Sequence, residues 1–408
     1  MAKSLPLFVG LDIGTGFIKI AAGQKKSGDD LEIIYAGQTP SRGVRRGVVF
    51  DVEAAAKCIA EAVEKAEMSL GHNVEGVYIS VNGSHIFCAS SRGLVSVSRA
   101  DGKISIEDVD RVLQASRTVS LSSSNKEIID VYPREFIVDS ETGVKDAIGM
   151  KGVRLEAEVL IVAGFTPYLK NSDKAVLRAE LEVLNRAPAA AASSSAVLSE
   201  QQKELGAAVL DIGSGTTNMA VYEEGDLLHL AVLPMGSANI TNDIAIGAKT
   251  DVVTAERIKI EKGTCFFKGA DKKIKLTGDA GGAPEKVFSQ RLVSKIIQER
   301  VGEIFELANK ELKKIGREKK LPAGIVLCGG GVKLGHIEET AKKIFQLTVS
   351  VGVPRGSENI DSDPAMAAAC GLANLGFKEQ EEEASGGAKF SSQGGWEKVK
   401  KFFKIFVP

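Results

Sequence analysis

The stretch AAVLDIGSGTTNMAVYEEG, residues 207–225, repeats an earlier one, FVGLDIGTGFIKIAAG, at residues 8–23. In both, an apolar β-rich run meets an acidic residue, a tight glycine turn and a second run, and a third run follows. The acidic residues, Asp12 and Asp211, occupy matching places. Because ligands in α/β folds bind at the carboxyl ends of strands, the repeat predicts two similar α/β domains with a ligand cleft between them.

The composition is that of a globular protein and excludes several classes. Hydrophobic residues make up 44% of the 408 residues and charged residues 26%, which is an ordinary balance. The net charge of −1 argues against nucleic-acid binding through bulk charge. The start does not resemble a signal peptide, and no run reaches the roughly 18 apolar residues that span a bilayer. Five cysteines without C-x-x-C spacing are expected to be reduced core thiols.

The two glycine turns are suited to binding phosphate. Glycine removes the Cβ that would block a ligand, and the N–H groups of such turns bind phosphate oxygens. The hydroxyl groups add donors, Lys19 would neutralise a phosphate, and two carboxylates facing each other suit Mg²⁺, usually through its waters. The residues expected at this site are Asp12, Gly14, Thr15, Gly16 and Lys19 in the first half and Asp211, Gly213, Ser214, Gly215, Thr216 and Thr217 in the second. The alternative is a pair of ordinary hairpin turns with Asp as the turn former.

Two further segments fit the same ligand. In GIVLCGGGVKLGHIEE, residues 324–339, a buried strand runs into three glycines and then a helix. Gly329, Gly330 and Gly331 would let the backbone lie flat against an adenine or ribose. In AERIKIEKG, Glu256 and Lys259 are three apart on one helical face and could reach the base and ribose edges. The alternative for this pair is an exposed surface salt bridge.

The two halves differ in what interrupts them. Residues 86–163 alternate strand-like and helix-like patterns, which predicts an inserted α+β subdomain. Residues 244–318 of the second half form another insertion and contain a long helical pattern at 287–312. Its apolar positions are Phe288, Leu292, Ile296, Ile304, Ala308 and Leu312. We therefore place the first core domain at residues 1–85 and 164–205 and the second at 206–243 and 319–377.

Two segments rich in small residues lie near the expected hinge. AAAASSSAVL at 189–198 and DSDPAMAAACGLANLG at 361–376 are expected to be helices that pack closely, although both patterns also fit plain core helices. Residues 378–395 are charged and then Gly/Ser-rich, which predicts a flexible linker.

The segment GGWEKVKKFFKIFVP, residues 394–408, contains the only tryptophan. On a helical wheel its apolar residues fall within an arc of about 140° with lysines opposite, which is typical of an interfacial helix on an anionic membrane. We therefore predict an amphipathic membrane-targeting helix at residues 396–408. The residues expected to bind the membrane, through the apolar face or through lysine charge, are Trp396, Val399, Lys400, Lys401, Phe402, Phe403, Lys404 and Phe406. The alternative is a helix that packs on its own domain. Attachment through one such helix would be weak, and polymerisation would strengthen it.

Together these elements resemble the actin superfamily of ATP-binding proteins. Within it, the chain is similar to the FtsA family of bacterial cell-division proteins over about residues 5–376 and in the tail. The motifs that carry this resemblance are PSRGVRRGVVFDVEAAAKCIAEAVEKAE, VYISVNGSHI and ELGAAVLDIGSGTTNMAVYEEG. The sequence departs from the family pattern in NRAPAAAASSSAVL, which lacks the usual glycine and bulky residues, and at Thr15-Gly16-Phe17.

The resemblance implies an actin-like fold that binds ATP with Mg²⁺ and forms filaments. It implies a peripheral protein at the cytoplasmic face of the cell membrane at the division site, bound to the C-terminal peptide of the tubulin-like FtsZ. Arg291, Arg300 and Glu303 of the second insertion are the candidate peptide contacts, and their alternative is solvated charge on an amphipathic helix. Other division proteins are expected at residues 86–163, and no nucleic acid is expected.

Other functions within the same superfamily compete with this interpretation. A sugar kinase needs a general base, and the two Asp residues are assigned only to metal. A DnaK-type chaperone needs a large peptide-binding domain after Phe377, where only 31 residues remain. A PilM-like pilus assembly protein shares the insertion but not the tail. We expect slow or no ATP hydrolysis, with an actin-superfamily ATPase or a PilM-like assembly protein as the alternative.

Overall fold

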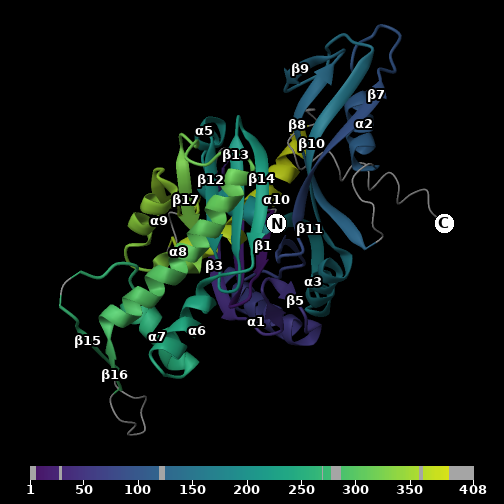
Figure 1. Ribbon diagram of the computed structural model, residues 1–408. Coiled ribbons are helices and arrows are strands. Elements are labelled where there is room, and N and C mark those ends of the chain that lie inside the picture. Colours follow the sequence, from purple (N-terminus) through teal and green to yellow (C-terminus); the bar gives the residue numbers. More distant parts are fainter. Residues whose placement is uncertain are drawn as a thin grey trace.

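The computed structural model describes residues 6–26, 30–118, 125–268, 270–276, 286–357 and 362–385. Figure 1 shows two α/β halves side by side, with a smaller unit around β7–β10 at the upper right and the β15–β16 hairpin at the lower left. No helix in these ranges is both long and apolar enough to cross a membrane.

The first half is built on a five-stranded sheet with the strand order β11-β6-β1-β2-β3. Its strands are β1 (Leu7–Ile13), β2 (Phe17–Lys25), β3 (Leu31–Pro40), β6 (Gly76–Val81) and β11 (Glu182–Pro188), and a short hairpin follows β3 as β4 (Val44–Arg45) and β5 (Val48–Val49). One face packs on α1 (Val52–Leu70) and α3 (Thr166–Arg178) through a shared apolar core. The Asp51 side chain caps α1, and Gly71 ends it with a left-handed φ of 70°.

The second half repeats this plan on a sheet ordered β14-β13-β12-β17-β18. Its strands are β12 (Ala207–Ile212), β13 (Thr217–Glu223), β14 (Asp226–Leu233), β17 (Gly324–Cys328) and β18 (Val349–Val351). The helices α6 (Ser237–Gly247), α7 (Val252–Lys262), α8 (Gln290–Lys314) and α9 (Ile337–Phe345) share one apolar core with it. In both halves three antiparallel strands are followed by a parallel partner for the first, β6 or β17. The prediction of two related α/β halves is confirmed.

The inserted unit has a sheet and a core of its own. Its strands are β7 (Phe87–Ser96), β8 (Lys126–Val138), β9 (Glu141–Val144) and β10 (Arg154–Phe165), and its helix is α2 (Ile106–Thr118). The strand order is β7-β10-β8-β9, and α2 covers the sheet through buried residues such as Val109 and Val112. The first and last strands are direct neighbours, with Phe87 paired to Ala163.

Two small-residue helices pack against each other in the middle of the molecule. They are α4 (Ala189–Val197) and α10 (Ala367–Ser385). A Cβ at Gly371 of α10 would lie 1.8 Å from the carbonyl oxygen of Ala192, so only glycine permits this approach. On the same helix, the Ala369 carbonyl would lie 2.1 Å from a Cβ at Gly10 of β1. The sequence prediction of close packing is therefore confirmed.

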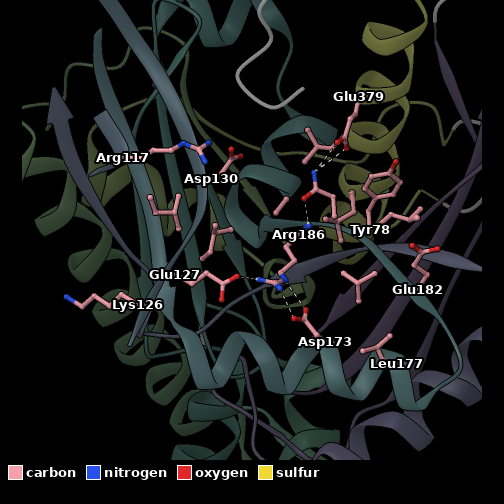
Figure 2. A pocket seen from close by; sticks show the side chains of 18 of the residues that line it. Tyr78, Arg117, Lys126, Glu127, Asp130, Asp173, Leu177, Glu182, Arg186 and Glu379 are labelled. Carbon is pink, nitrogen blue, oxygen red and sulfur yellow. Dashed lines mark hydrogen bonds and ion pairs between the residues drawn. The ribbon is translucent and has the colours of Figure 1, made fainter. Parts of the chain in front are cut away.

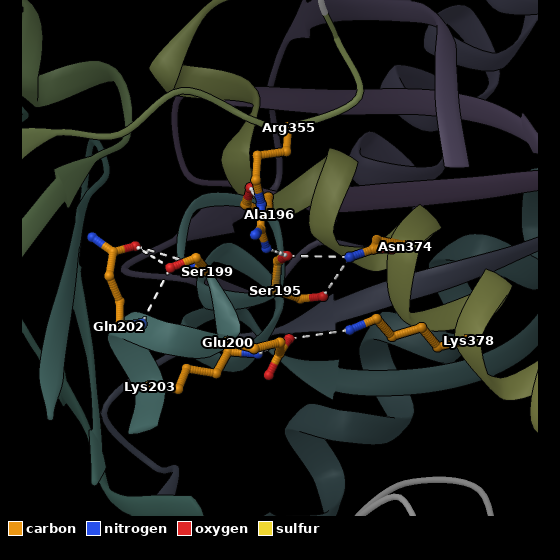
Figure 3. Close-up of polar contacts among 9 residues, drawn as sticks. All are labelled: Ser195, Ala196, Ser199, Glu200, Gln202, Lys203, Arg355, Asn374 and Lys378. Atoms are coloured by element: carbon orange, nitrogen blue, oxygen red, sulfur yellow. Dashed lines mark hydrogen bonds and ion pairs between the residues drawn. The ribbon is translucent and has the colours of Figure 1, made fainter. Parts of the chain in front are cut away.

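Polar contacts fix the point where the chain passes from the first half to the second (Figure 3). The Arg355 guanidinium donates to the Ser195 carbonyl at 3.2 Å and to the Ala196 carbonyl at 3.4 Å, at the carboxyl end of α4. Asn374 of α10 donates to the Ser195 carbonyl as well, at 3.1 Å. Ser199 then caps α5 (Glu200–Leu205), which leads into β12. A cation such as Arg355 is favourable at the carboxyl end of a helix, and Arg355 and Asn374 together join three segments here.

The long helix begins later than its sequence pattern predicted. Phe288 lies in β16 (Lys286–Ser289), which pairs with β15 (Lys273–Leu276), and Ser289 caps α8 by accepting from the Leu292 N–H at 3.0 Å. Leu292 is 42% exposed. The prediction was wrong at this end because a short hairpin uses residues that also fit a helical spacing. The buried stripe of α8 is Val293, Ile297, Val301, Ile304, Phe305, Ala308 and Leu312.

The predicted linker also begins too early. Residues 378–385 continue α10 to Ser385 instead of starting a flexible segment. Glu381 forms an ion pair with Lys25 at 2.9 Å, and Lys378 forms one with Glu200 at 3.5 Å. Glutamate, glutamine and lysine are good helix formers, so a charged stretch that directly follows a packed helix extends it. The rest of the predicted linker and the predicted membrane helix, residues 386–408, lie outside the described residues.

The cysteines agree with their predicted role as core thiols in all but one position. All five are free, and Cys58, Cys265, Cys328 and Cys370 are buried. Cys88 is only half-buried, and its thiol donates to the Leu230 carbonyl at 3.1 Å.

Candidate functional site

A cavity of about 360 Å³ lies where the two repeated glycine turns meet. The turn after β1 closes with a hydrogen bond from Gly14 N–H to the Phe17 carbonyl at 3.1 Å, and the turn after β12 closes from Gly213 N–H to the Thr216 carbonyl at 2.9 Å. Both turns are therefore β-hairpins, as the alternative proposed. They face each other from opposite halves of the molecule, which ordinary hairpins have no reason to do.

The two turns touch through glycine. A Cβ at Gly16 would lie 2.9 Å from the Cβ of Ser214, and a Cβ at Gly215 would lie 2.7 Å from Thr15 Oγ1. Thr15 is held in place because its Oγ1 accepts a hydrogen bond from the Gly47 N–H at 2.8 Å. Any larger residue at either glycine would push the two halves apart, so these positions set the width of the cleft.

Neither aspartate forms the turn that follows it. Asp12 is 5% exposed, and its Oδ1 accepts a hydrogen bond from Ser80 Oγ at 2.7 Å. Asp211 is 6% exposed, and its Oδ2 accepts from Ser193 Oγ at 2.6 Å. A Cβ at Gly329, whose φ is +88°, would lie 2.3 Å from Asp211 Oδ1. The carboxylates are thus built into the cavity wall, and the turn-former alternative does not hold.

Lys19 provides the positive charge between the two aspartates. Its Nζ lies 3.2 Å from Asp12 Oδ2. Burial alone would lower the pKa of Lys19, but the carboxylates of Asp12 and Asp211 outweigh it and the pKa is raised. Burial raises the pKa of Asp211, with Lys19 and the Ser193 hydroxyl opposing that rise. One buried cation shared by two buried carboxylates leaves the group net negative, which is a setting that favours a divalent cation.

The opposite side of the cavity is formed by α7 and the segment after β17. Lys259 Nζ lies 2.8 Å from Glu256 Oε2 and donates to Thr241 Oγ1 at 2.8 Å and to the Ser237 carbonyl at 3.2 Å. Lys259 is only 8% exposed, whereas the Glu256 side chain is 44% exposed, so this ion pair is buried at the lysine and reaches the surface at the glutamate. A Cβ at Gly330 would meet nothing closer than 4.0 Å, so its backbone borders open space.

Most of the predicted site residues line this one cavity, and two do not. The Thr217 hydroxyl donates to the Met235 carbonyl at 2.9 Å, and Gly329 lies behind Asp211. The predicted residues that do line it are Asp12, Gly14, Thr15, Gly16, Lys19, Asp211, Gly213, Ser214, Gly215, Thr216, Glu256, Lys259, Gly330 and Gly331.

The structure adds lining residues that the sequence interpretation missed, including Asn82, Asn218 and Ser237. Asn82 Nδ2 donates to Thr216 Oγ1 at 3.2 Å and so bridges the two halves. Asn218 pairs across the hairpin with Asp211, as Lys19 pairs with Asp12. The repeat therefore contained the signal for Asn218. Its Oδ1 is buried without a hydrogen-bond partner among the described residues, which fits a polar ligand in the cavity.

The residues predicted to contact a partner peptide are not part of this cavity. Arg300 of α8 binds Asp243 of α6 through two hydrogen bonds of 2.5 and 3.1 Å and pairs with Glu303 at 2.6 Å. The Arg291 N–H donates to Asp271 Oδ1 at 3.0 Å, nine residues away from Arg300 along the same helix. Arg300 and Glu303 therefore form one cluster, and Arg291 lies about 13 Å from it along the axis. The predicted membrane contacts, Trp396 to Phe406, lie outside the described residues.

Two duplicated α/β halves that enclose a cavity between paired turns define an actin-like protein. Solved structures agree: the chain matches a PilM–PilN type IV pilus biogenesis complex with a TM-score of 0.65 at 17% identity, covering 91% of this chain and 98% of that one. MreB5 of Spiroplasma citri bound to ADP matches with a TM-score of 0.55 at 13% identity, covering 93% and 99%. At these identities the likeness shows the fold.

The sequence comparisons give the family. The family described as the SHS2 domain inserted in FtsA matches residues 83–163, and the cell division protein FtsA family matches residues 208–371. The FtsA of Pseudomonas aeruginosa is 34% identical over 398 residues, covering 96% of this chain and 94% of that protein. The FtsA of Bacillus subtilis is 36% identical over 349 residues, covering 85% and 79%. The chain belongs to the FtsA family of cell division proteins.

Proposed function

We propose that the chain binds ATP with Mg²⁺, polymerises as an actin-like protein at the cytoplasmic face of the cell membrane, and tethers the FtsZ ring there. The observation that carries this proposal is the cavity between the two glycine turns, with two buried carboxylates and one buried lysine beside it. MreB5, which shares the fold, was solved with ADP bound. Nucleotide in this cavity would contact both halves at once and so favour one arrangement of the hinge.

Different lining residues would bind different parts of the nucleotide. The backbone N–H groups of the two turns would bind phosphate oxygens, and Lys19 would balance their charge. Asp12 and Asp211 would hold Mg²⁺ through its waters, and the ion would neutralise phosphate charge. Glu256 and Lys259 lie on the opposite wall, where the base and ribose would be placed beside Gly330 and Gly331. We propose slow or no hydrolysis, because both carboxylates are assigned to metal and neither to activating a water.

The FtsZ peptide is assigned to the exposed end of the second insertion. Arg300 lies between Asp243 and Glu303, and its side chain is 24% exposed. An acidic peptide would bind by exchanging one of these carboxylates for its own, since a guanidinium binds carboxylates through paired hydrogen bonds. Arg291, at the start of α8, would contact another part of the same peptide. Substituting Arg300 by Ala should abolish this binding and leave nucleotide binding unchanged.

The remaining contacts complete the tether. The residues 396–407 would bind anionic lipid through their aromatic face and lysines, each lysine near the surface contributing on the order of 1 kcal/mol. One such helix binds weakly, and a filament presents many at high effective concentration. Other division proteins would contact the inserted unit at residues 86–163.

Co-sedimentation with anionic vesicles tests the proposal. The full chain is compared with a chain cut after Gly395, each with and without ATP–Mg²⁺ and an FtsZ tail peptide. We expect only the full chain to pellet, carrying the peptide with it. If both forms stay in solution while ATP is turned over rapidly, the tether is rejected and the alternative of an actin-superfamily ATPase or a PilM-like assembly protein replaces it. The PilM-like alternative is retained because the PilM–PilN complex shares the fold of this chain, with a TM-score of 0.65.

A further inference from the structure

A larger cavity, of about 830 Å³, lies between the inserted unit and the first half. Figure 2 shows Arg117 and Asp130 on one side and Glu379 of α10 on another, with Arg186 between them. The walls come from α2 and β8 of the inserted unit, from α3 and β11 of the first half, and from the middle of α10, residues 372–379. This cavity shares no lining residue with the one between the glycine turns.

Large apolar side chains are exposed on its walls. Leu177 of α3 is 60% exposed and Leu184 of β11 is 42% exposed, and both line the cavity. β11 is the edge strand of its sheet, so one side of its backbone is not paired within that sheet. Single exposed leucines are common, but two beside a cavity and an open strand edge form a surface that a second segment would cover.

The charges of the cavity select a basic occupant. Five carboxyl groups line it, against the cations Arg117, Lys126 and Arg186. Arg186 is already bound to Glu127 at 2.8 Å and to Asp173 at 2.6 Å. The Glu182 carboxylate has no ion-pair partner among the described residues, and Glu379 receives a bond of 3.3 Å from Asn185. Even when Asp130 is protonated, four carboxylates line the cavity against three cations, so the net charge of its walls is negative.

The tail of this same chain has the complementary composition. Residues 396–408 hold four lysines, one glutamate, three phenylalanines and the only tryptophan. Glu379 lines the cavity six residues before α10 ends at Ser385, and ten residues separate that end from Trp396. Ten residues reach up to about 35 Å when extended, which is enough to return the tail to the cavity.

We propose that residues 396–407 bind this cavity when no membrane is present. The aromatic face covers Leu177 and Leu184, and the lysines lie against the carboxyl groups. A tethered segment experiences an effective concentration in the millimolar range, so even a weak contact is populated, and this favours the chain's own tail over a free partner. The inference rests on the proposed function in one respect: the same face binds lipid, so vesicles and the cavity compete for it.

Trp396 gives a direct readout, because it is the only tryptophan in the chain. Without vesicles or nucleotide, the emission of the full chain is expected to be shifted to the blue and shielded from acrylamide, relative to a free peptide of residues 394–408. The double variant Leu177→Asn/Leu184→Asn removes the apolar surface without adding charge, and it should restore the emission and quenching of the free peptide. Met68→Asn is the control, because Met68 is 80% exposed on α1 and does not line the cavity.

Vesicle binding supplies the second readout. If the docked fraction of tails is about three quarters, releasing them lowers the half-saturating lipid concentration about fourfold. The double variant should show this gain, and Met68→Asn should not. Circular dichroism and thermal denaturation confirm that the variants are folded, as expected for substitutions of exposed side chains.

Three outcomes would overturn the inference. The first is that Trp396 in the full chain has the emission of the free peptide, and the second is that its shielding persists in the double variant. The third is that shielding appears only as the protein concentration is raised, which would place the tail on a second copy of the chain. These results are distinct from failure of the proposed tether. If Trp396 is unshielded and the chain still binds vesicles, only the inference fails. If Trp396 is shielded through Leu177 and Leu184 and vesicles do not bind, the tether fails and the docking stands.

Discussion

At the scale of single residues, the candidate nucleotide cavity depends on two glycines that meet from opposite halves. Gly16 and Gly215 permit the contact, while Asp12, Asp211 and Lys19 provide the charge. The repeated Asp-Ile-Gly-x-Gly motif made most of this site predictable. The motif did not indicate Asn218, because Asn218 lies seven residues after Asp211 in the sequence and comes next to it only through the pairing of β12 with β13. The bridging role of Asn82 required the two halves to be placed together.

Substitution of Gly215 by Ala should weaken ATP binding about 10- to 100-fold, since overpacking typically costs about 1–3 kcal/mol. The new Cβ would lie 2.7 Å from Thr15 Oγ1, which Gly47 holds in place. Titration of a fluorescent ATP analogue measures the effect. Gly302→Ala is the matched control, because nothing lies within 4 Å of a Cβ there and Gly302 is inside α8. Equal affinities for both variants would contradict the role of Gly215.

Asp130 should make stability depend on pH. Burial raises the pKa of Asp130 to about 7, against the opposing charge of Arg117. The folded chain therefore holds this proton more tightly than the unfolded chain, and the stabilisation it gives is present below about pH 4 and lost as the pH rises through about 7. Asp130→Asn keeps a neutral group, so its melting temperature should rise relative to wild type between pH 5 and pH 8. A difference that is the same at both pH values, or that the exposed Asp146→Asn also shows, would count against this assignment.

At the scale of elements, close helix packing in the middle of the molecule was predictable, and helix ends were not. Runs of alanine, glycine and serine indicated α4 and α10 because small side chains permit short distances between helices. The start of α8 was misplaced, since Phe288 fits both a helical spacing and the β16 strand. The end of α10 was placed too early because the charged residues after Phe377 resemble a linker in composition, although they are good helix formers.

The contact between α4 and α10 should tolerate no side chain at residue 371. Gly371→Ala would place a Cβ 1.8 Å from the Ala192 carbonyl oxygen, and the helices would have to separate. We expect the free energy of unfolding to fall by about 1–3 kcal/mol, as in other overpacked cores. Urea denaturation measures it, with Gly302→Ala, which should be neutral or slightly stabilising in a helix, as the reference. If the free energy of unfolding falls no more than in the reference variant, the two helices separate at little energetic cost and the close contact is not required.

At the scale of the whole molecule, the arrangement connects the candidate nucleotide cavity, the crossing between the two halves and the second cavity. The cavity joins the two halves, Arg355 and Asn374 hold the crossing between them, and α10 runs from that crossing to the second cavity. This relation between distant segments is not visible in the sequence, because it depends on how the inserted unit is set against the first half.

Vesicle binding by the full chain should rise steeply with protein concentration once filaments form. A polymer presents many tails together, whereas a single helix of about 12 residues is marginal. Raising the ionic strength should weaken the binding, because lysine contributes through a screened attraction. Light scattering and vesicle sedimentation in one concentration series measure both events. If vesicle binding does not change at the protein concentration where polymerisation begins, filaments are not required for the tether.

The pairing of Phe87 with Ala163 has a consequence for how such proteins change over time. The two ends of the inserted unit are neighbours on adjacent antiparallel strands, where Cα atoms are about 4.5–5.5 Å apart. A few residues can bridge that gap, so an ancestor could acquire, lose or exchange the whole 75-residue segment between them, residues 88–162, by recombination without disturbing the sheet that carries it. The unit has its own core, and it can therefore change in sequence independently while the two glycine turns that meet between the halves stay constrained.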